Sequence, residues 1–418
     1  MTLHRVAVTG TGSVSPYGKG SELLFNSLLV GESAVRYHEP LNQFKELGPR
    51  VAGIVKNVDI SEVPRKHRRS MSPMSVYALM ASQEAMQEAA FPEEMLRNGR
   101  TGLIMGSTMG SVNTIEEFFR DYGIQGNLEQ MKSMLFFRVM GHSVAANVAQ
   151  ALGVTGRVFA PTSACSTSCQ AIGLAYEAIA FGRQDTVLCG GADEYHPLTT
   201  GTFDLMLAAS SGYNATPEKT PRPFDVARDG IVCSEGAGVL LLESFDSAKA
   251  RGAKILAEIV GFSSTSDPSS IANPDPDPLY SCMREALANA NIAPQAVSYI
   301  NAHATGTVQG DMAESKAIAM LVGNNTPVSS LKGHMGHTMA ASGALESVAC
   351  VHMLQKQVVL PTLNLENPDP QCAGVLLLQK VEPRPVSVIV KNNFALGGIN
   401  CSLVLRGYDD GCTNHLGG

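Results

Sequence analysis

Short apolar segments alternate with longer helical patterns along most of this 418-residue chain. Each apolar segment is rich in Val, Ile or Leu, as in TGLIMG (101–106), DTVLCGGAD (185–193) and VSVIVKNN (386–393). Such runs are typical of strands in a sheet that is covered on both faces. Strands that alternate with helices pack as layers of helix on sheet, and the sequence therefore predicts an α/β fold.

Length, charge and cysteine content limit the classes of protein to which the chain can belong. It is long enough to bury a large core, as two domains or as one duplicated unit. A net charge of −7 argues against a nucleic-acid partner, because nucleic-acid-binding surfaces are basic. No apolar run approaches the length of a membrane-spanning helix, and the first residues lack the layout of a signal peptide. Nine cysteines without a C-x-x-C motif indicate reduced thiols and a cytoplasmic protein.

One internal repeat divides the chain. Residues 165–188 and 337–360 are both small-residue helical patterns followed by a strand pattern, and they align without a gap at an offset of 172 residues. This alignment places Cys165 and His337 at the N-termini of matching helices, which would meet near a pseudo-two-fold centre. We place the first half at 1–252, the second half at 253–408 and a polar tail at 409–418.

The segment FAPTSACSTSCQAIGLA (159–175) contains the strongest candidate nucleophile. A loop over 161–163 leads into a helix that is buried nearly all round. Cys165 lies at the N-terminus of this helix, where unpaired N–H groups and the helix dipole lower the pKa of a thiol. Cys169 lies one turn further and lacks that advantage. The alternative, a buried cysteine that acts only as a small apolar side chain, stays open at this point.

Two histidine segments in the second half offer partners for the thiol. His303 ends an apolar strand pattern, and Lys332, His334 and His337 lie within six residues of one another. The pair His334 and His337 has a spacing that a metal ion could use, but no third ligand follows and Lys332 would repel a cation. A cysteine with two distant histidines fits nucleophilic catalysis better, because such partners meet in space rather than in sequence.

The segment VAVTGTGSVSPYG (6–18) has glycines after a strand pattern, as a dinucleotide-binding loop does. Its third glycine, Gly18, comes six residues after Gly12, and no acidic residue follows at the distance that a ribose-binding carboxylate requires. These two failures argue against nucleotide binding and hydride transfer. We interpret the segment as a strand-to-helix turn.

Four segments together resemble a known family: APTSACSTS (160–168), NAHATGTVQGD (301–311), SLKGHMGHTMAASG (330–343) and NNFALGGIN (392–400). They occur in the order and approximate spacing of the β-ketoacyl-acyl-carrier-protein synthases, and the resemblance extends over about residues 3–406. The chain is most similar to the elongating I/II type, which uses a Cys-His-His triad. The starter type, with a Cys-His-Asn triad, fits less well because His337 holds the third position. The resemblance implies a thiolase-like five-layered α-β-α-β-α fold built from two similar halves.

The resemblance also implies roles for individual residues. Cys165 would take an acyl group as a thioester, with the backbone N–H groups of Cys165 and Phe394 as the oxyanion hole. His303 and His337 would stabilise the enolate that forms when malonyl-acyl-carrier protein loses CO2. Attack on the acyl thioester would then give a β-ketoacyl-carrier protein two carbons longer, in fatty-acid or polyketide/polyene chain elongation. Supporting positions carried over from the family are Lys332 and Glu346 beside the histidines, Thr305 and Thr307 for pantetheine, Met109 and Phe203 for the acyl pocket, and Phe394 as a gate.

The same resemblance implies a binding partner for a basic run of the chain. VPRKHRRSMS (63–72) is the densest positive cluster of an acidic chain, and its basic residues are Arg65, Lys66, Arg68 and Arg69. From the residues alone it fits a solvated loop as well as a docking site. The synthases bind an acidic acyl carrier protein at such a cluster, which favours docking.

The resemblance implies no bound metal or cofactor, because phosphopantetheine on the carrier protein carries the substrates. It implies a homodimer, with 133–153 as part of the contact, while a heterodimer with a related ketosynthase or chain-length factor stays open. Two alternatives are a non-catalytic chain-length factor and a thiolase-fold enzyme that acts on coenzyme A. The presence of Cys165 speaks against the first, and the basic cluster speaks against the second. Ala304, Ala395 and Leu396 depart from the family pattern and suggest a specialised acyl substrate.

Overall fold

Twelve strands form one continuous sheet in the computed structural model, which describes residues 3–126 and 132–408. The order along the sheet is β13 (Leu376–Leu377), β11 (Pro327–Ser329), β10 (Tyr299–Asn301), β15 (Val388–Phe394), β16 (Ile399–Gly407), β9 (Ala257–Ser266), β1 (Val6–Ser15), β8 (Gly236–Ser244), β7 (Thr186–Asp193), β5 (Thr101–Gly106) and β6 (Val158–Phe159), with β2 (Gly18–Lys19) paired to β1. The three strand segments quoted from the sequence are β5, β7 and β15, so these predictions are confirmed.

The strand order is nearly symmetric about its centre. Outward from β1 the strands are β8, β7, β5 and β6, and outward from β9 they are β16, β15, β10 and β11. In both directions two antiparallel pairs are followed by parallel ones. β1 and β9 themselves pair only through Val6–Val8 and Ala257–Ile259. The sheet therefore consists of two similar half-sheets joined by a short antiparallel contact.

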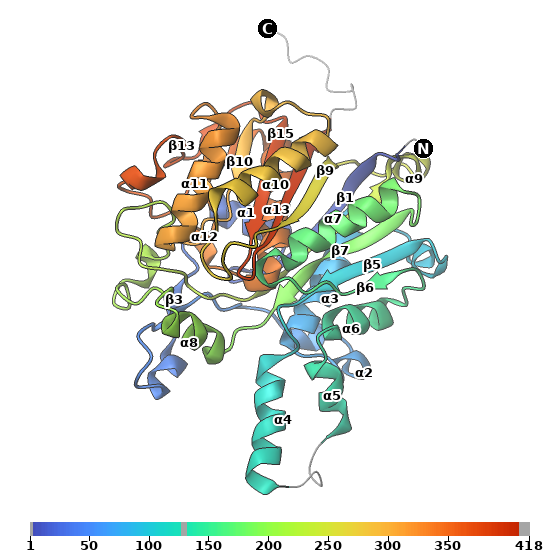
Figure 1. Cartoon of the computed structure of the whole chain (residues 1–418). Helices are drawn as coiled ribbons and strands as arrows, with labels where there is room; N and C mark the ends of the chain where they lie inside the picture. Colours follow the sequence, from blue (N-terminus) through green and yellow to red (C-terminus); the bar gives the residue numbers. More distant parts are fainter. Residues whose placement is uncertain (1–2, 127–131, 409–418) are drawn as a thin grey trace.

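Helices complete the layers (Figure 1). α7 (Thr167–Ala180) and α13 (Ser342–Lys356) contact each other and strands of both half-sheets, so they lie between them. α3 (Pro73–Glu88) and α6 (Ser143–Leu152) cover the outer face of the first half-sheet, and α10 (Pro276–Asn289) and α11 (Val308–Val322) cover that of the second. Three apolar cores fill the spaces between these layers. The predicted five-layered fold is confirmed.

Glycine allows the two central helices to approach closely. A Cβ atom on Gly343 of α13 would lie 2.5 Å from the backbone nitrogen of Cys169 in α7. A Cβ atom on Gly173 of α7 would lie 2.2 Å from the ring of Phe262 in β9. Real side chains do not tolerate such distances, so these positions require glycine if the inner layer is to keep its thickness.

The predicted repeat exists, but its alignment is wrong by three residues. α7 begins at 167 and α13 begins at 342, so the helices correspond at an offset of 175 rather than 172. Cys165 then matches Ala340, and His337 lies in the loop before the helix. A shift of three residues is close to one helical turn, so small-residue patterns match almost equally well in both alignments. The N-termini do meet, since the Ser342 hydroxyl donates to the carbonyl of Cys165 at 3.3 Å.

The strand that follows each central helix also differs between the copies. β7 follows α7 directly, whereas α13 is followed by β12 (Val358–Val359), which pairs with β14 (Glu382–Pro383) outside the main sheet. The counterpart of β7 is β15, which comes later in the chain. The predicted boundary at residue 252 falls between α9 (Phe245–Ala250) and β9, and the division into domains stays a prediction.

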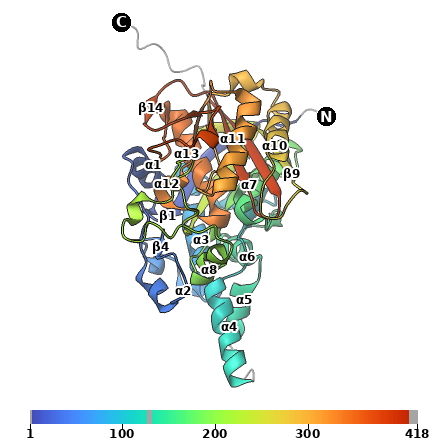
Figure 2. The ribbon, with the colours of Figure 1, turned by 60° about the vertical axis from the view of Figure 1, so that its left-hand side comes forward.

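A helical arm projects from the body (Figures 1 and 2). It contains α4 (Val112–Gln125) and α5 (Ser133–Val139), and its exposed large apolar side chains are Phe119, Tyr122, Ile124, Met134, Phe136 and Phe137. A gathering of exposed aromatic side chains is typical of a surface that a partner covers. Among the described helices, none is both long and apolar enough to cross a bilayer.

Candidate active site

A strained turn presents Cys165 at the centre of the molecule. The turn is η4 (Ala164–Ser166), and Ala164 has φ 46°, a left-handed conformation that residues with a Cβ rarely adopt. Two hydrogen bonds hold it, from the Ser166 N–H to the Ser163 carbonyl and from the Ser163 N–H to the Thr167 hydroxyl, both 2.9 Å. Strain that the surroundings hold in this way is typical of functional sites.

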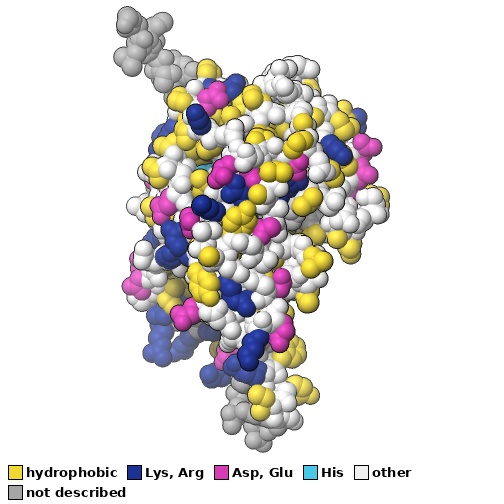
Figure 3. Space-filling view, turned by 90° about the vertical axis from the view of Figure 1, so that its left-hand side faces the viewer, with side chains coloured by type: hydrophobic (Ala, Val, Ile, Leu, Met, Phe, Trp, Pro, Cys, Tyr) yellow, Lys and Arg dark blue, Asp and Glu magenta, His cyan; other side chains and the backbone are white. Residues whose placement is uncertain are grey.

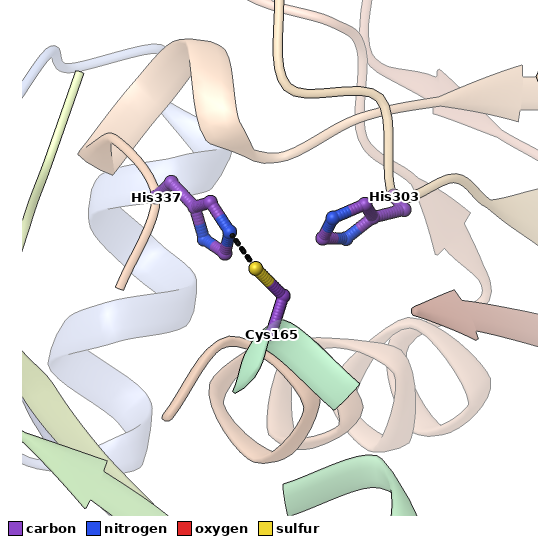
Figure 4. A group of neighbouring side chains, drawn as sticks. All are labelled: Cys165, His303 and His337. Atoms are coloured by element: carbon purple, nitrogen blue, oxygen red, sulfur yellow. Dashed lines mark hydrogen bonds between the residues drawn. The ribbon is translucent and has the colours of Figure 1, made fainter. Parts of the chain in front are cut away.

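His337 contacts the thiol directly. Its Nε2 atom lies 2.9 Å from the Sγ atom of Cys165 (Figure 4). Its Nδ1 atom accepts a hydrogen bond of 3.2 Å from the backbone N–H of Met339. A neutral imidazole carries one proton, so the ring that accepts at Nδ1 carries its proton on Nε2. His337 therefore presents an N–H donor at the sulfur.

His303 also points toward the thiol, from the end of β10 in the second half-sheet (Figure 4). It follows β10, and the carboxylate of Glu314 accepts the backbone N–H groups of His303 and Ala304 at 2.8 and 2.7 Å. The rings of His303 and His337 lie 5.2 Å apart at 82°. One ring nitrogen of each histidine and the sulfur of Cys165 lie within 4.8 Å of one another. The structure thus brings together the three residues that the sequence singled out.

Two buried lysines flank this group. The Nζ atoms of Lys332 and Lys391 lie 2.6 Å from the two carboxylate oxygens of Glu346, and all three side chains are fully buried. Lys332 and Glu346, the two supporting positions carried over from the family, thus contact each other. Sequence reasoning missed Lys391, although a lysine at the end of the apolar run VSVIV was a signal that could have found it. The positive charges also disfavour a metal ion among the cysteine and the histidines.

Burial decides the protonation states of the site. It raises the pKa of the Cys165 thiol to about 11, against the opposing effects of Lys332 and of the backbone N–H groups of Cys165 and Leu396. The expectation of a lowered thiol pKa is therefore wrong, because removal from water outweighs the helix N-terminus. Burial, followed by the charge of Lys332, holds the pKa values of His303 and His337 well below their usual range. At neutral pH the site holds a thiol and two neutral imidazoles.

A cavity of about 540 Å³ opens over the thiol. The predicted site residues that line it are Cys165, His303, His337, Phe394, Thr305, Thr307 and Phe203. Apolar side chains such as Leu207, Ile231 and Leu396 complete the wall. Met109 is 47% exposed and lies outside this lining, so its role in an acyl pocket stays a prediction.

The basic run forms the short helix α2 (Arg65–Arg68) and the residue after it. Arg65, Lys66 and Arg69 are exposed, and Arg68 is half-buried because its Nε atom donates to the Val63 carbonyl. Arg138 of α5 donates to the carbonyls of Arg68 and Arg69, which joins the run to the base of the arm. In the view of Figure 3, lysine and arginine side chains gather in the lower part of the molecule.

Known proteins are similar to this chain in sequence and in fold. The family model described as "Beta-ketoacyl synthase, N-terminal domain" matches residues 3–248, and the one described as "Beta-ketoacyl synthase, C-terminal domain" matches residues 256–366. The 3-oxoacyl-[acyl-carrier-protein] synthase 1 of Haemophilus influenzae is 34% identical over 412 residues, which cover 97% of this chain and all of the relative. The chain belongs to the β-ketoacyl synthase family. The synthase 1 of Escherichia coli K12 is likewise 34% identical, over 98% of this chain and all of the relative.

Solved structures agree with this membership. A β-ketoacyl synthase from Burkholderia phymatum has a TM-score of 0.94 and 39% identity, and the match covers 97% of this chain and all of that one. A ketosynthase solved in complex with a type II PKS acyl-carrier protein has a TM-score of 0.89 and 31% identity, with the same coverage. The ishigamide ketosynthase/chain length factor has a TM-score of 0.90 at 28% identity. The predicted family and fold are confirmed, and the protein is a condensing enzyme of fatty-acid or polyketide chain elongation.

Proposed function

We propose that Cys165 takes an acyl group from the phosphopantetheine thioester of an acyl carrier protein. The sulfur attacks the thioester carbonyl, the bond to the pantetheine sulfur breaks, and the thiol proton passes to the departing thiolate. The observation that carries this proposal is the 2.9 Å contact between the Cys165 sulfur and Nε2 of His337 inside one buried cavity. The oxyanion hole would comprise the backbone N–H of Cys165 and an N–H of the turn from Phe394 to Leu396.

The second half-reaction uses the histidines as hydrogen-bond donors. Malonyl-carrier protein loses CO2, and negative charge develops on its thioester oxygen. Neutral imidazoles that donate a ring N–H to this oxygen stabilise the enolate without giving up a proton. The carbanion then attacks the acyl thioester on Cys165, the C–S bond breaks, and a β-ketoacyl chain two carbons longer leaves on the carrier protein. The Cys165 thiolate left behind takes a proton from water, which restores the thiol. Lys332 and Glu346 support the histidines electrostatically.

The cavity offers a path for the pantetheine arm. Thr305 and Thr307 line it, and their hydroxyl groups lie 3.1 Å apart, so both can bond to the amides of the arm. Phe394 lines the same cavity as the thiol and is the proposed gate, and Phe203 is proposed to contact the acyl chain. The reaction needs no bound cofactor or metal, since the carrier protein brings the reactive thioester.

The partners and the setting follow from the same chemistry. We propose that Arg65, Lys66, Arg68 and Arg69 dock an acidic acyl carrier protein by charge. The apolar arm is proposed to pack against a second subunit, either another copy of this chain or a related ketosynthase or chain-length factor. Thiols that must stay reduced suit the cytoplasm.

Intact-protein mass spectrometry tests the proposal. The protein is incubated with a panel of acyl-carrier proteins and then with malonyl-carrier protein. We expect one acyl adduct on Cys165 that disappears in the second step, and the preferred acyl group will identify the substrate. Cys165→Ala should give no adduct, whereas Cys169→Ala, one turn along the same helix, should still form it. An adduct on Cys165→Ala, or no adduct with any donor, would overturn the proposal.

A further inference from the structure

β15 carries a lysine that is completely withdrawn from water. The Nζ atom of Lys391 contacts a Glu346 oxygen at 2.6 Å and donates to the Asn392 carbonyl at 2.6 Å and to Oδ1 of Asn393 at 2.7 Å. Two of these contacts, to Asn392 and Asn393, are hydrogen bonds, and the contact with Glu346 is an ion pair without hydrogen-bond geometry. A buried charge of this kind is expensive and persists where it is fully paired.

Lys332 alone would suffice to neutralise Glu346. The carboxylate of Glu346 contacts Lys332 through one oxygen and Lys391 through the other, so the buried trio has a net charge of +1. The second lysine therefore does more than balance a carboxylate. Its additional contact is Asn393, and that contact leads to the active site.

Lys391 determines the orientation of the Asn393 amide. An ammonium group can only donate, so the side-chain oxygen of Asn393 must face Lys391 and the NH2 group must face the other way. The Nδ2 atom lies 3.3 Å from Nδ1 of His303 and 3.1 Å from the Ser342 hydroxyl. Because Nδ2 donates, the Nδ1 atom of His303 has to accept.

We propose that Lys391 and Asn393 are positioning residues that hold the His303 proton on Nε2, the ring nitrogen left free for the substrate. The inference rests on the proposed role of His303 in decarboxylation, and it assigns the group that prepares the ring for that role. His337 reaches the same tautomer by a shorter route, through the backbone N–H of Met339. The two histidines thus become equivalent donors by different means.

Asn393→Asp is the decisive variant, because aspartate has the same shape but only accepts. The Nδ1 atom of His303 would then carry the proton and donate to the carboxylate, and Nε2 would become an acceptor. We expect decarboxylation of malonyl-carrier protein to fall about 100-fold, the effect of losing one donor to an oxyanion. Formation of the acyl adduct on Cys165, which does not use His303, should stay within about threefold and so confirms correct folding.

The pH profile separates this effect from a structural defect. The charged and titratable groups that face His303 are Lys332 from α12 (Lys332–Met335), His337 from the loop after it, Lys391 from β15, Glu314 from α11 and Cys165 from η4. A carboxylate beside Nδ1 stabilises the imidazolium, which again carries a proton on Nε2. Decarboxylation by Asn393→Asp should therefore increase as the pH falls, and the unsubstituted enzyme should show no such increase.

Nitrogen NMR reads the tautomer without any substrate. In protein labelled with ¹⁵N-histidine, the His303 signals, assigned with His303→Gln, should show a protonated Nε2 in the unsubstituted enzyme and a protonated Nδ1 in Asn393→Asp. Lys391→Met should give a mixture of tautomers and about tenfold slower decarboxylation, because the amide can then turn either way. Ser342→Ala is the matched control, since it removes the other Asn393 contact and should leave the tautomer unchanged.

The two proposals fail in different ways. A protonated Nε2 in Asn393→Asp, with unchanged decarboxylation, would overturn the role of Lys391 and Asn393. A protonated Nδ1 in the unsubstituted enzyme would overturn it as well. Absence of a Cys165 adduct or of decarboxylation in the unsubstituted enzyme would instead overturn the proposed function, and the NMR measurement would still decide the tautomer.

Discussion

The two central helices begin in the same way but carry different chemistry. The turns before them, η4 and η7 (Met339–Ala341), both start with a residue in the left-handed conformation, Ala164 at φ 46° and Met339 at φ 51°. In the first copy the turn presents Cys165 to the cavity. In the second copy the N–H of Met339 orients the ring of His337. A duplicated backbone has kept its strained turn and uses it once for a nucleophile and once for a hydrogen-bond donor.

The helices differ most in buried charge. At the offset of 175 residues, Glu346 of α13 corresponds to Ala171 of α7, and both side chains are fully buried. The second half also supplies Lys332, Lys391 and Glu314 to the surroundings of the site. The backbone geometry thus occurs in both copies, whereas the buried lysines that help to lower the histidine pKa values lie in the second copy.

Removal of the carboxylate from the buried trio should have the largest effect on stability. Glu346→Gln leaves Lys332 and Lys391 close together without a counter-charge, and breaking a buried ion pair in this way typically costs about 3–5 kcal/mol. Urea unfolding measures the loss. Glu314→Gln is the control, because that carboxylate accepts N–H groups instead of pairing with lysines, and it should cost about 1–3 kcal/mol. Equal losses would show that pairing with two lysines adds nothing to the contribution of the Glu346 carboxylate.

Buried histidines outside the site allow a second comparison. His196 of the first half has both ring nitrogens bonded, to Glu116 at 2.9 Å and to the Leu198 N–H at 3.0 Å. His334 of the second half is fully buried, and within the described residues neither ring nitrogen makes a hydrogen bond of normal geometry, although the Leu331 backbone slightly opposes the effect of burial on its pKa. Burial lowers the pKa of His334 from 6.5 to about 4. Its contribution to stability is therefore complete above pH 6.5 and is lost as the pH falls toward 4.

His334→Met should remove part of the acid sensitivity. The unsubstituted protein should lose about 2 kcal/mol more than this variant between about pH 7 and about pH 5, given 1.4 kcal/mol for each pKa unit. Urea unfolding at the two pH values measures the difference. If both proteins lost stability equally, the His334 imidazole would not be the group that titrates.

Charge reversal in the basic run tests the surface of the first half. Arg69→Glu should raise the KM for acyl-carrier protein about tenfold at low salt, with kcat nearly unchanged, because docking is electrostatic and remote from the thiol. Lys254→Glu reverses the charge of an exposed lysine near the start of β9 and should leave the KM within about twofold of the unsubstituted value. Steady-state kinetics at two ionic strengths measure both. Equal KM values for the two variants would exclude the run as a docking site.

The smallest expected effect concerns the shared turn. Ala164→Gly relieves a left-handed conformation that costs an alanine about 1 kcal/mol, partly offset by the greater freedom of glycine in the unfolded chain. The melting temperature should therefore rise slightly, while acylation of Cys165 becomes slower because the thiol is held less firmly. A fall in melting temperature would show that the turn stores no strain at this position.

The class of fold and the principal site residues could be predicted from the amino-acid sequence alone. Strand and helix patterns are local, so β5, β7, β15 and the central helices follow from residues that are neighbours in the chain. The motifs around Cys165, His303 and His337 identified the family, and the structure places these three side chains together. The repeat was also visible, although its register was not, because a shift of three residues barely changes a helical pattern.

The electrostatics of the site could not be predicted before the fold was known. The raised pKa of Cys165, the neutral histidines and the contact between Asn393 and His303 all depend on residues from separate elements of the chain. Desolvation depends on everything that surrounds a group, and a hydrogen-bond donor is identified only when its acceptor is in place. A local pattern therefore predicts that a cysteine begins a helix, but the complete fold determines whether that cysteine is charged.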